Sequence, residues 1–238
     1  MTNFLQVSSL CPLLVRYSFV FALLCIPTSL FAQKEIKLNL FDLQGSGKLT
    51  IINRDVSVSQ EGSKRFIKIE KKLQPGQMPG KGEEGVIWLP VNEFSQGTIE
   101  LVVRGRDILQ GSFVGLAFHA VNDSTFDNVY CRPFNFRTVD PVRKIHALQY
   151  VYVPTYDWQK LRAEQNGKYE KGIATPPAAT DWFTLTVQVE GNNVKAFINH
   201  EELPSLAVKK LNQTTKGRVG LTGINYDIES VNVLYQAK

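Results

Sequence analysis

The densest group of polar and aromatic side chains lies in residues 119–137, which read HAVNDSTFDNVYCRPFNFR. An imidazole such as that of His119 can act as a general base, and a guanidinium such as that of Arg132 can stabilise a developing anion. Aromatic rings such as that of Tyr130 pack on the apolar faces of sugars, while charged and amide side chains satisfy sugar hydroxyls. The segment therefore predicts a site that binds or processes carbohydrate.

Two neighbouring strands, expected at residues 112–121 and 126–132, would bring these groups to one face of a sheet. Successive side chains of a strand point to opposite faces, so every second residue lines the same surface. This alternation predicts that His119, Tyr130 and Arg132 converge. Small residues alternate with them in the first strand, which would leave room for a ligand.

We take His119 and Arg132 as candidate catalytic residues. The candidate ligand-binding residues are Asp127, Tyr130, Asn135, Arg137, His146, Gln149 and Trp158. A structural role for the whole cluster stays open. An arginine on a sheet face often pairs with a carboxylate, here Asp127 or Asp140, and a lone histidine is often a hydrogen-bonded core residue.

A calcium site is a weaker alternative within the same segment. Asn122, Asp123, Ser124 and Asp127 would supply oxygen ligands, which Ca²⁺ prefers. The full D-x-[DN]-x-[DN]-G loop is missing, so a polar turn closed by side-chain hydrogen bonds is favoured. The histidines are far apart in the sequence and form no HExxH motif. We therefore predict no metal ligands and no cofactor, with a structural calcium as the alternative.

Several enzyme classes lose support because their motifs are missing. The sequence contains no GxSxG motif, no phosphate-binding loop and no dinucleotide fingerprint. It also lacks an ExDxxE strand, which argues against an ordinary retaining glucanase with paired carboxylates. Cys131 is expected to be a small apolar filler rather than a nucleophile.

The composition is that of an ordinary globular protein. The 238 residues include 27 Lys and Arg against 22 Asp and Glu, a net charge of +5, and 43% of residues are hydrophobic. These values exclude a disordered or collagen-like chain. Because the small positive excess is not gathered into basic runs, no nucleic-acid partner is predicted.

Residues 1–32 have the pattern of a secretory signal peptide. Arg16 is their only charged residue, the apolar run 17–26 follows it, and the small residue Ala32 suits cleavage. The run is shorter than the ~20 residues that cross a bilayer. We predict a secreted or periplasmic domain at residues 33–238 with no membrane contact after cleavage, although the segment could be kept as an anchor. Cleavage would leave Cys131 as the only thiol, so no internal disulfide is possible.

The remaining sequence reads as short strands separated by turn residues. Gly191 and the two asparagines after it lie between two alternating runs, which is a strong hairpin signal. Residues 156–165 form a helical pattern with Asp157 near its start and Gly167 beyond its end. The pattern predicts an all-β fold, a two-sheet antiparallel jelly-roll sandwich with one short helix near residues 156–165. The expected strands are 34–41, 65–71, 85–89, 97–104, 112–121, 126–132, 144–153, 182–190, 194–199, 218–222 and 230–235.

Several segments resemble a family of secreted bacterial proteins in the concanavalin A-like lectin/glucanase superfamily. They are GVIWLP, FSQGTIELVVRG, SFVGLAFHA, FDNVYCRPFNFR and HALQYVYVPTYDWQKL, with residues 181–220 matching the superfamily's closing hairpin. The chain looks nearest to the laminin-G-like and 3-keto-disaccharide hydrolase (domain of unknown function 1080) groups. The resemblance implies a concanavalin A-like jelly roll and a carbohydrate ligand. The chain departs from the hydrolases near Phe41, where it reads FDLQGSGKL instead of an LFDGKTLxxW-like segment.

Three functions follow as alternatives. The first is an exported module that holds or processes a glycan on the concave sheet face. The second is an enzyme that acts on 3-keto-glycosides: the ketone at C3 acidifies the C2 proton, His119 removes it, Arg132 stabilises the enolate, and the aglycone leaves by elimination. The third is a non-catalytic surface interaction domain. The oligomeric state is left open.

Overall fold

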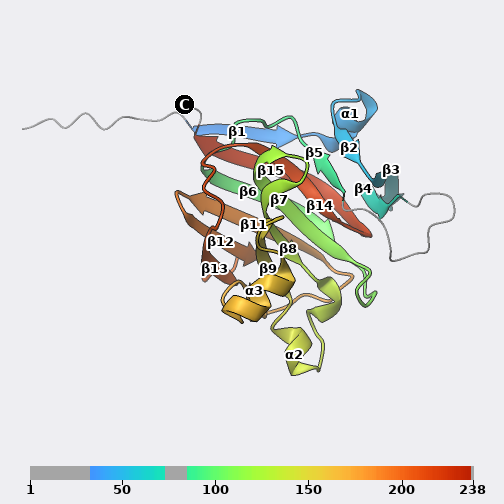
Figure 1. The fold of residues 1–238 in the computed structure, drawn as a ribbon. Helices are drawn as coiled ribbons and strands as arrows, with labels where there is room; N and C mark the ends of the chain where they lie inside the picture. The colour runs from blue at the N-terminus through green and yellow to red at the C-terminus, as the bar shows by residue number, and fades with distance from the viewer. Residues whose placement is uncertain (1–32, 73–84, 237–238) are drawn as a thin grey trace, which may run out of the picture. The chain divides into compact units, whose positions relative to one another are not determined.

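Two antiparallel sheets packed face to face make up the domain (Figure 1). The structure is a computed structural model that describes residues 33–72 and 85–236. The predicted signal peptide, residues 1–32, lies outside the described residues. Within them, no helix is long and apolar enough to cross a membrane.

The two sheets join strands that are far apart in the sequence. The eight-stranded sheet has the order β13 (Leu206–Lys209), β12 (Asn193–Ile198), β11 (Trp182–Glu190), β6 (Gly97–Arg104), β15 (Tyr226–Gln236), β4 (Lys64–Lys71) and β3 (Arg54–Glu61), with β1 (Gln33–Leu38) also pairing with β15. The seven-stranded sheet has the order β10 (Glu170–Lys171), β9 (Leu148–Val153), β8 (Thr125–Cys131), β7 (Phe113–Asn122), β14 (Arg218–Ile224), β5 (Val86–Trp88) and β2 (Thr50–Ile52). The predicted two-sheet antiparallel sandwich is confirmed.

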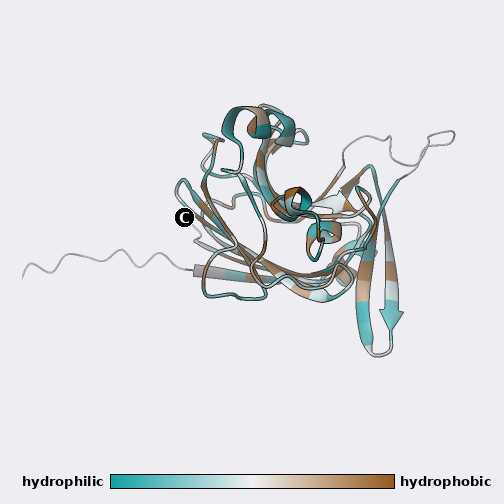
Figure 2. Cartoon of the chain, turned by 90° about the horizontal axis from the view of Figure 1, so that it is seen from below, coloured by the Kyte–Doolittle hydropathy of each residue, from teal (hydrophilic) through white to brown (hydrophobic). Residues whose placement is uncertain are grey.

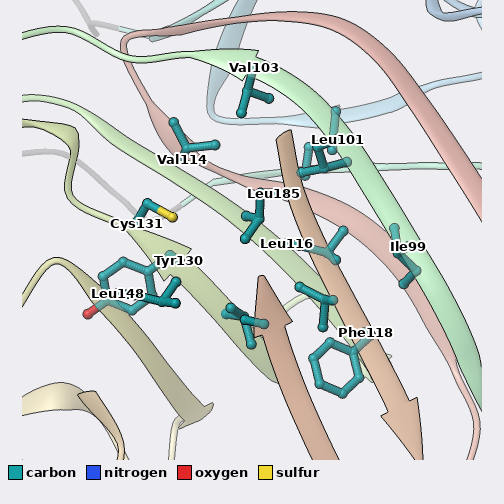
Figure 3. Packing of buried hydrophobic residues seen from close by; sticks show 14 of the residues in the cluster. Ile99, Leu101, Val103, Val114, Leu116, Phe118, Tyr130, Cys131, Leu148 and Leu185 are labelled. Carbon is teal, nitrogen blue, oxygen red and sulfur yellow. The ribbon is translucent and has the colours of Figure 1, made fainter. Parts of the chain in front are cut away.

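The core lies between the sheets because alternate side chains of each strand are apolar. In β6, Ile99, Leu101 and Val103 are fully buried, and the residues between them are less so. Figure 3 shows Leu101 and Leu185 of one sheet packing near Leu116 of the other. Figure 2 shows hydrophobic and hydrophilic residues following one another along the strands, as expected where one sheet face is buried.

The predicted helix is present, but it is not alone. α3 (Trp158–Gln165) begins after Asp157, whose carboxylate accepts the Lys160 N–H. The prediction of a single helix is wrong, because α1 (Leu40–Gly45), α2 (Pro141–Lys144) and the 3₁₀ helix η1 (Pro133–Asn135) also form. The side chain of Asn39 caps α1, which ends the strand predicted at 34–41 early, and Asp140 followed by a proline starts α2.

A bulge in β7 changes which residues face the core. His119 has a positive φ of 49°, and the pairing of β7 with β14 shifts by one residue between Ala117 and Ala120. One extra residue reverses the faces of all residues that follow it. As a result Ala120 joins a cluster with Trp88 on the outer face of the seven-stranded sheet, and His119 is buried.

Candidate functional site

A hollow of about 650 Å³ lies over the outer face of the seven-stranded sheet. Its floor is formed by side chains of β8, β9 and β14, and residues of η1, α2 and α3 contribute to its wall; α3 lies beside β9 in Figure 1. Its polar and aromatic lining includes Asn128, Tyr130, Arg132, Asn135, Arg143, His146, Trp158, Arg162 and Thr222.

Gly115 of β7 lets the floor side chains meet. A Cβ at this position would lie 2.2 Å from the Thr222 hydroxyl oxygen and 3.0 Å from the Tyr130 Cβ. In this space the Thr222 hydroxyl donates to Asn128 Oδ1 at 2.9 Å. The floor is therefore a continuous layer across β8, β7 and β14.

Arg132 anchors a polar network at one end of the hollow. Its Nη2 donates to the Tyr130 hydroxyl at 2.8 Å and to Gln149 Oε1 at 2.6 Å, and its Nη1 donates to the His146 carbonyl at 2.8 Å. The residue is only 7% exposed, and this burial lowers the pKa of its guanidinium. The guanidinium is therefore held rigidly by neutral acceptors.

A second arginine belongs to the same network. Arg143 Nε donates to Asn135 Oδ1 at 3.0 Å, and its Nη2 donates to the Phe134 carbonyl at 2.6 Å. Asn135 in turn donates to the His146 carbonyl at 3.5 Å, which also accepts from Arg132. Arg132 and Arg143 are thus linked through Asn135 and one backbone carbonyl.

Glu170 holds a third group of side chains beside this network. Arg162 donates to its carboxylate through Nε at 3.0 Å and Nη2 at 2.8 Å, and His146 Nδ1 lies 2.7 Å from Oε2. Burial lowers the pKa of His146 despite the nearby carboxylate, which favours the neutral ring. The Arg162 guanidinium lies 4.8 Å from the ring centre of Trp158, which is 41% exposed.

The structure brings some of the sequence-predicted site residues together. Tyr130, Arg132, Asn135, His146 and Trp158 line the hollow. Their role in binding stays a prediction.

The other predicted ligand-binding residues lie outside the lining. Gln149 is fully buried and accepts from Arg132. Arg137 is exposed; it donates to the Pro176 carbonyl at 3.1 Å and lies 3.7 Å from Asp181.

The expectation that His119 shares a face with Tyr130 and Arg132 is wrong. The bulge turns His119 into the interior, where its Nε2 lies 2.8 Å from the Ser95 carbonyl oxygen and its Nδ1 lies 3.5 Å from Asp127 Oδ2. Both side chains are fully buried.

Asp127, also predicted as a ligand-binding residue, is correspondingly inaccessible. It lies on the same face of β8 as Val129 and Cys131, and its carboxylate accepts the hydroxyl hydrogen of Tyr150. These two predicted site residues belong to a polar cluster inside the sandwich.

The residues of the proposed calcium turn are engaged with one another or with nearby side chains. Asn122 Oδ1 accepts the Ser124 N–H at 3.0 Å, and Asp123 Oδ1 accepts from Trp88 Nε1 and Arg218 Nη2, both at 2.8 Å. The part of the chain that is described contains no group of three or more His, Cys, Asp or Glu residues able to hold a metal ion. The favoured interpretation, a polar turn, describes this geometry.

Sequence reasoning missed Arg143, Arg162 and Asn128 as lining residues. Arg162 follows Trp158 by four positions, so the two share a helix face, and this spacing was the available signal. Arg143 carried no such signal, because its position depends on the short helix α2, where a strand was predicted from residue 144.

We expect Cys131 to resist alkylation in the native protein. The residue is fully buried among the apolar side chains between the sheets, and burial raises the pKa of its thiol (Figure 3). The reactive thiolate is therefore scarce and inaccessible. Iodoacetamide treatment followed by mass spectrometry of the Cys131 peptide should show modification only in denaturant. Rapid labelling of this peptide without denaturant would contradict the burial.

No protein-family model matches the chain, and no curated protein matches it. Among solved structures, a Bacillus subtilis protein of unknown function with a galectin-like fold aligns with a TM-score of 0.56 and 13% identity, over 86% of this chain and 98% of that one. This likeness shows the fold, a galectin-like sandwich.

Two further solved structures align less closely. The carbohydrate-binding module CBM66 of Bacillus subtilis gives a TM-score of 0.43 at 14% identity, over 79% of this chain and 92% of that one. The exoplasmic/lumenal domain of VIP36, bound to Ca²⁺ and Man3GlcNAc, gives 0.46 at 13% identity, over 78% of this chain and 84% of that one.

Proposed function

We propose that this domain binds carbohydrate in the hollow over the seven-stranded sheet. The observation that carries the proposal is the combination of an exposed tryptophan, Trp158, with planar hydrogen-bonding side chains around one 650 Å³ space. An indole ring can cover the apolar face of a sugar, while Asn128 and Asn135 can bond its hydroxyls. The sequence resemblance to the concanavalin A-like superfamily supports the same ligand class.

The position of His119 supports binding over the elimination reaction. Abstraction of a C2 proton from a 3-keto-glycoside would need His119 and Arg132 at one substrate. His119 is enclosed between the sheets, and Arg132 lies at the outer hollow. A laminin-G-like binding module therefore agrees better with the geometry than a relative of the 3-keto-disaccharide hydrolases. A hollow of this size also favours a small ligand over a purely protein-binding surface.

We also propose that residues 1–32 direct export of the domain to the periplasm or the cell exterior. The charged residue, the apolar run and the small residue at the end support this proposal. Mass spectrometry of the N-terminus after expression in a bacterial host would test it.

A glycan array that contains neutral and acidic saccharides tests the binding proposal. We expect at least one saccharide class to bind, and Trp158→Ala to weaken that binding about tenfold or more, since an aromatic contact of this kind contributes roughly 1–2 kcal/mol. Trp182→Ala is the matched control, because Trp182 lies on β11 in the opposite sheet and packs against Phe66.

The array result would contradict the proposal if no saccharide binds, or if both tryptophan variants bind like the parent protein. Hydrolysis assays on 3-keto-glycosides belong beside the array. We expect no turnover of these substrates. If turnover is seen and persists in His119→Phe, a residue other than His119 must act as the base.

A further inference from the structure

The hollow carries an excess of positive charge. Its lining includes five cationic side chains and two carboxylates. Both carboxylates are already engaged: Asp123 accepts from Trp88 and Arg218, and Asp157 caps α3. The cationic residues are Arg54, Lys71, Arg132, Arg143 and Arg162.

Two of these cations, Arg132 and Arg143, have no charged partner in the part of the chain that is described. Their acceptors are backbone carbonyls, a phenol and side-chain amides, and no described carboxylate oxygen lies within 4.0 Å of either guanidinium. Arg132 is 7% exposed. A buried cation without an opposite charge is costly, and an anion that enters beside it offsets that cost.

The nearby carboxylate of Glu170 does not neutralise this pair. Glu170 is 3% exposed and makes a bidentate contact with Arg162, so its charge is already matched. His146 also lies beside Glu170, and burial lowers the pKa of its ring, which favours the neutral form. The positive charge of Arg132 and Arg143 is therefore left over at this end of the hollow.

Both arginines also have unused donors. Arg132 Nε and Arg143 Nη1 donate to no acceptor among the described residues, while their other nitrogens are held by the protein. Arginine N–H groups that are fixed in this way suit the oxygens of a carboxylate or a sulfate.

We propose that the saccharide bound in this hollow is acidic, and that its carboxylate or sulfate group lies between Arg132 and Arg143. This inference rests on the proposed carbohydrate-binding function and narrows its ligand class. Neutral contacts from Trp158 and Asn128 would hold the rest of the sugar, and the two guanidiniums select the charged unit.

The test compares two pairs of probes by calorimetry on the full chain. The first pair is an oligogalacturonate and its fully methyl-esterified form, and the second is a sulfated galactan oligosaccharide and its desulfated form. We expect the charged member of at least one pair to bind about tenfold tighter or more, and the difference to shrink as salt rises. The first pair reports a carboxylate ligand and the second a sulfate ligand.

Arg143→Gln is the informative variant, because Arg143 is half-buried, whereas loss of the more buried Arg132 would also unfold its surroundings. We expect Arg143→Gln to abolish most of the preference for the charged probe in a protein that stays folded, with a lower melting temperature because Asn135 and Phe134 lose a donor. Arg65→Gln removes the same charge from an exposed position on β4 in the other sheet and should keep the preference.

The possible outcomes separate this inference from the proposed function. If neither pair shows a preference while the array detects a neutral saccharide, the acidic ligand is refuted and carbohydrate binding stands. A preference that survives Arg143→Gln places the anion elsewhere and also overturns the inference. Binding of no saccharide in either assay overturns both proposals.

Discussion

Tyr150→Phe is expected to lower the free energy of unfolding by about 3 kcal/mol, because it strands two polar groups inside the sandwich. The Tyr150 hydroxyl donates to the carboxylate of Asp127 and accepts the Leu211 N–H at 2.7 Å. Asp127 is fully buried, and its second oxygen makes no hydrogen bond in the described structure. Burial and the neighbouring Asp127 raise the pKa of Tyr150, so the phenol stays protonated and remains a donor.

Urea unfolding measured by fluorescence would test this prediction. Tyr152→Phe is the matched control, since Tyr152 lies on the same strand, is half-buried, and makes no side-chain hydrogen bond with the described residues. Equal stability of the two variants would mean that the buried carboxylate does not depend on Tyr150. Saccharide binding should be unchanged in both variants at temperatures where they are folded.

Asn128→Trp is expected to abolish ligand binding, with a loss of affinity of about 100-fold or more. Asn128 is a half-buried residue of β8 on the floor of the hollow. The strand β8 lies between β7 and β9, so Asn128 is central in this part of the sheet. An indole ring there would occupy part of the space that a sugar needs. The cost to the fold is small, because the variant loses one hydrogen bond from Thr222, about 1 kcal/mol.

Asn128→Ala separates the blocking effect from the lost hydrogen bond. This variant removes the same Thr222 contact without filling the hollow, so its affinity should fall much less than that of Asn128→Trp. The measurement is a titration with the best saccharide from the array. Parent-like affinity of a folded Asn128→Trp variant would place the ligand site on another surface.

The sandwich could be predicted because its central strands alternate strongly. The hairpin of β11 and β12 closes at Gly191, which has a positive φ of 54°, with Glu190 opposite Asn193, as the glycine and asparagines of the turn indicate. The strand β3 was missed because most of its side chains are exposed or half-buried, so no apolar face marks it in the sequence.

The site was only partly predictable. Tyr130 follows the regular alternation of β8, Arg132 comes directly after the last residue of that strand, and both line the hollow as the alternation predicts. His119 does not, because the bulge depends on a left-handed backbone conformation that is uncommon outside glycine, and no glycine marks this position in the sequence. The wall formed by Arg143 depends on a four-residue helix, which is too short to leave a periodic pattern.

The bulge at His119 has a consequence for how such a protein can change. Because β7 carries one extra residue here relative to β14, loss of a single codon would restore regular pairing with β14, and the residues of β7 that follow would exchange faces. A point substitution alters one side chain, whereas this single deletion would change the face to which several consecutive side chains point. An insertion or deletion near residue 119 would therefore change which side chains reach the outer face in one step.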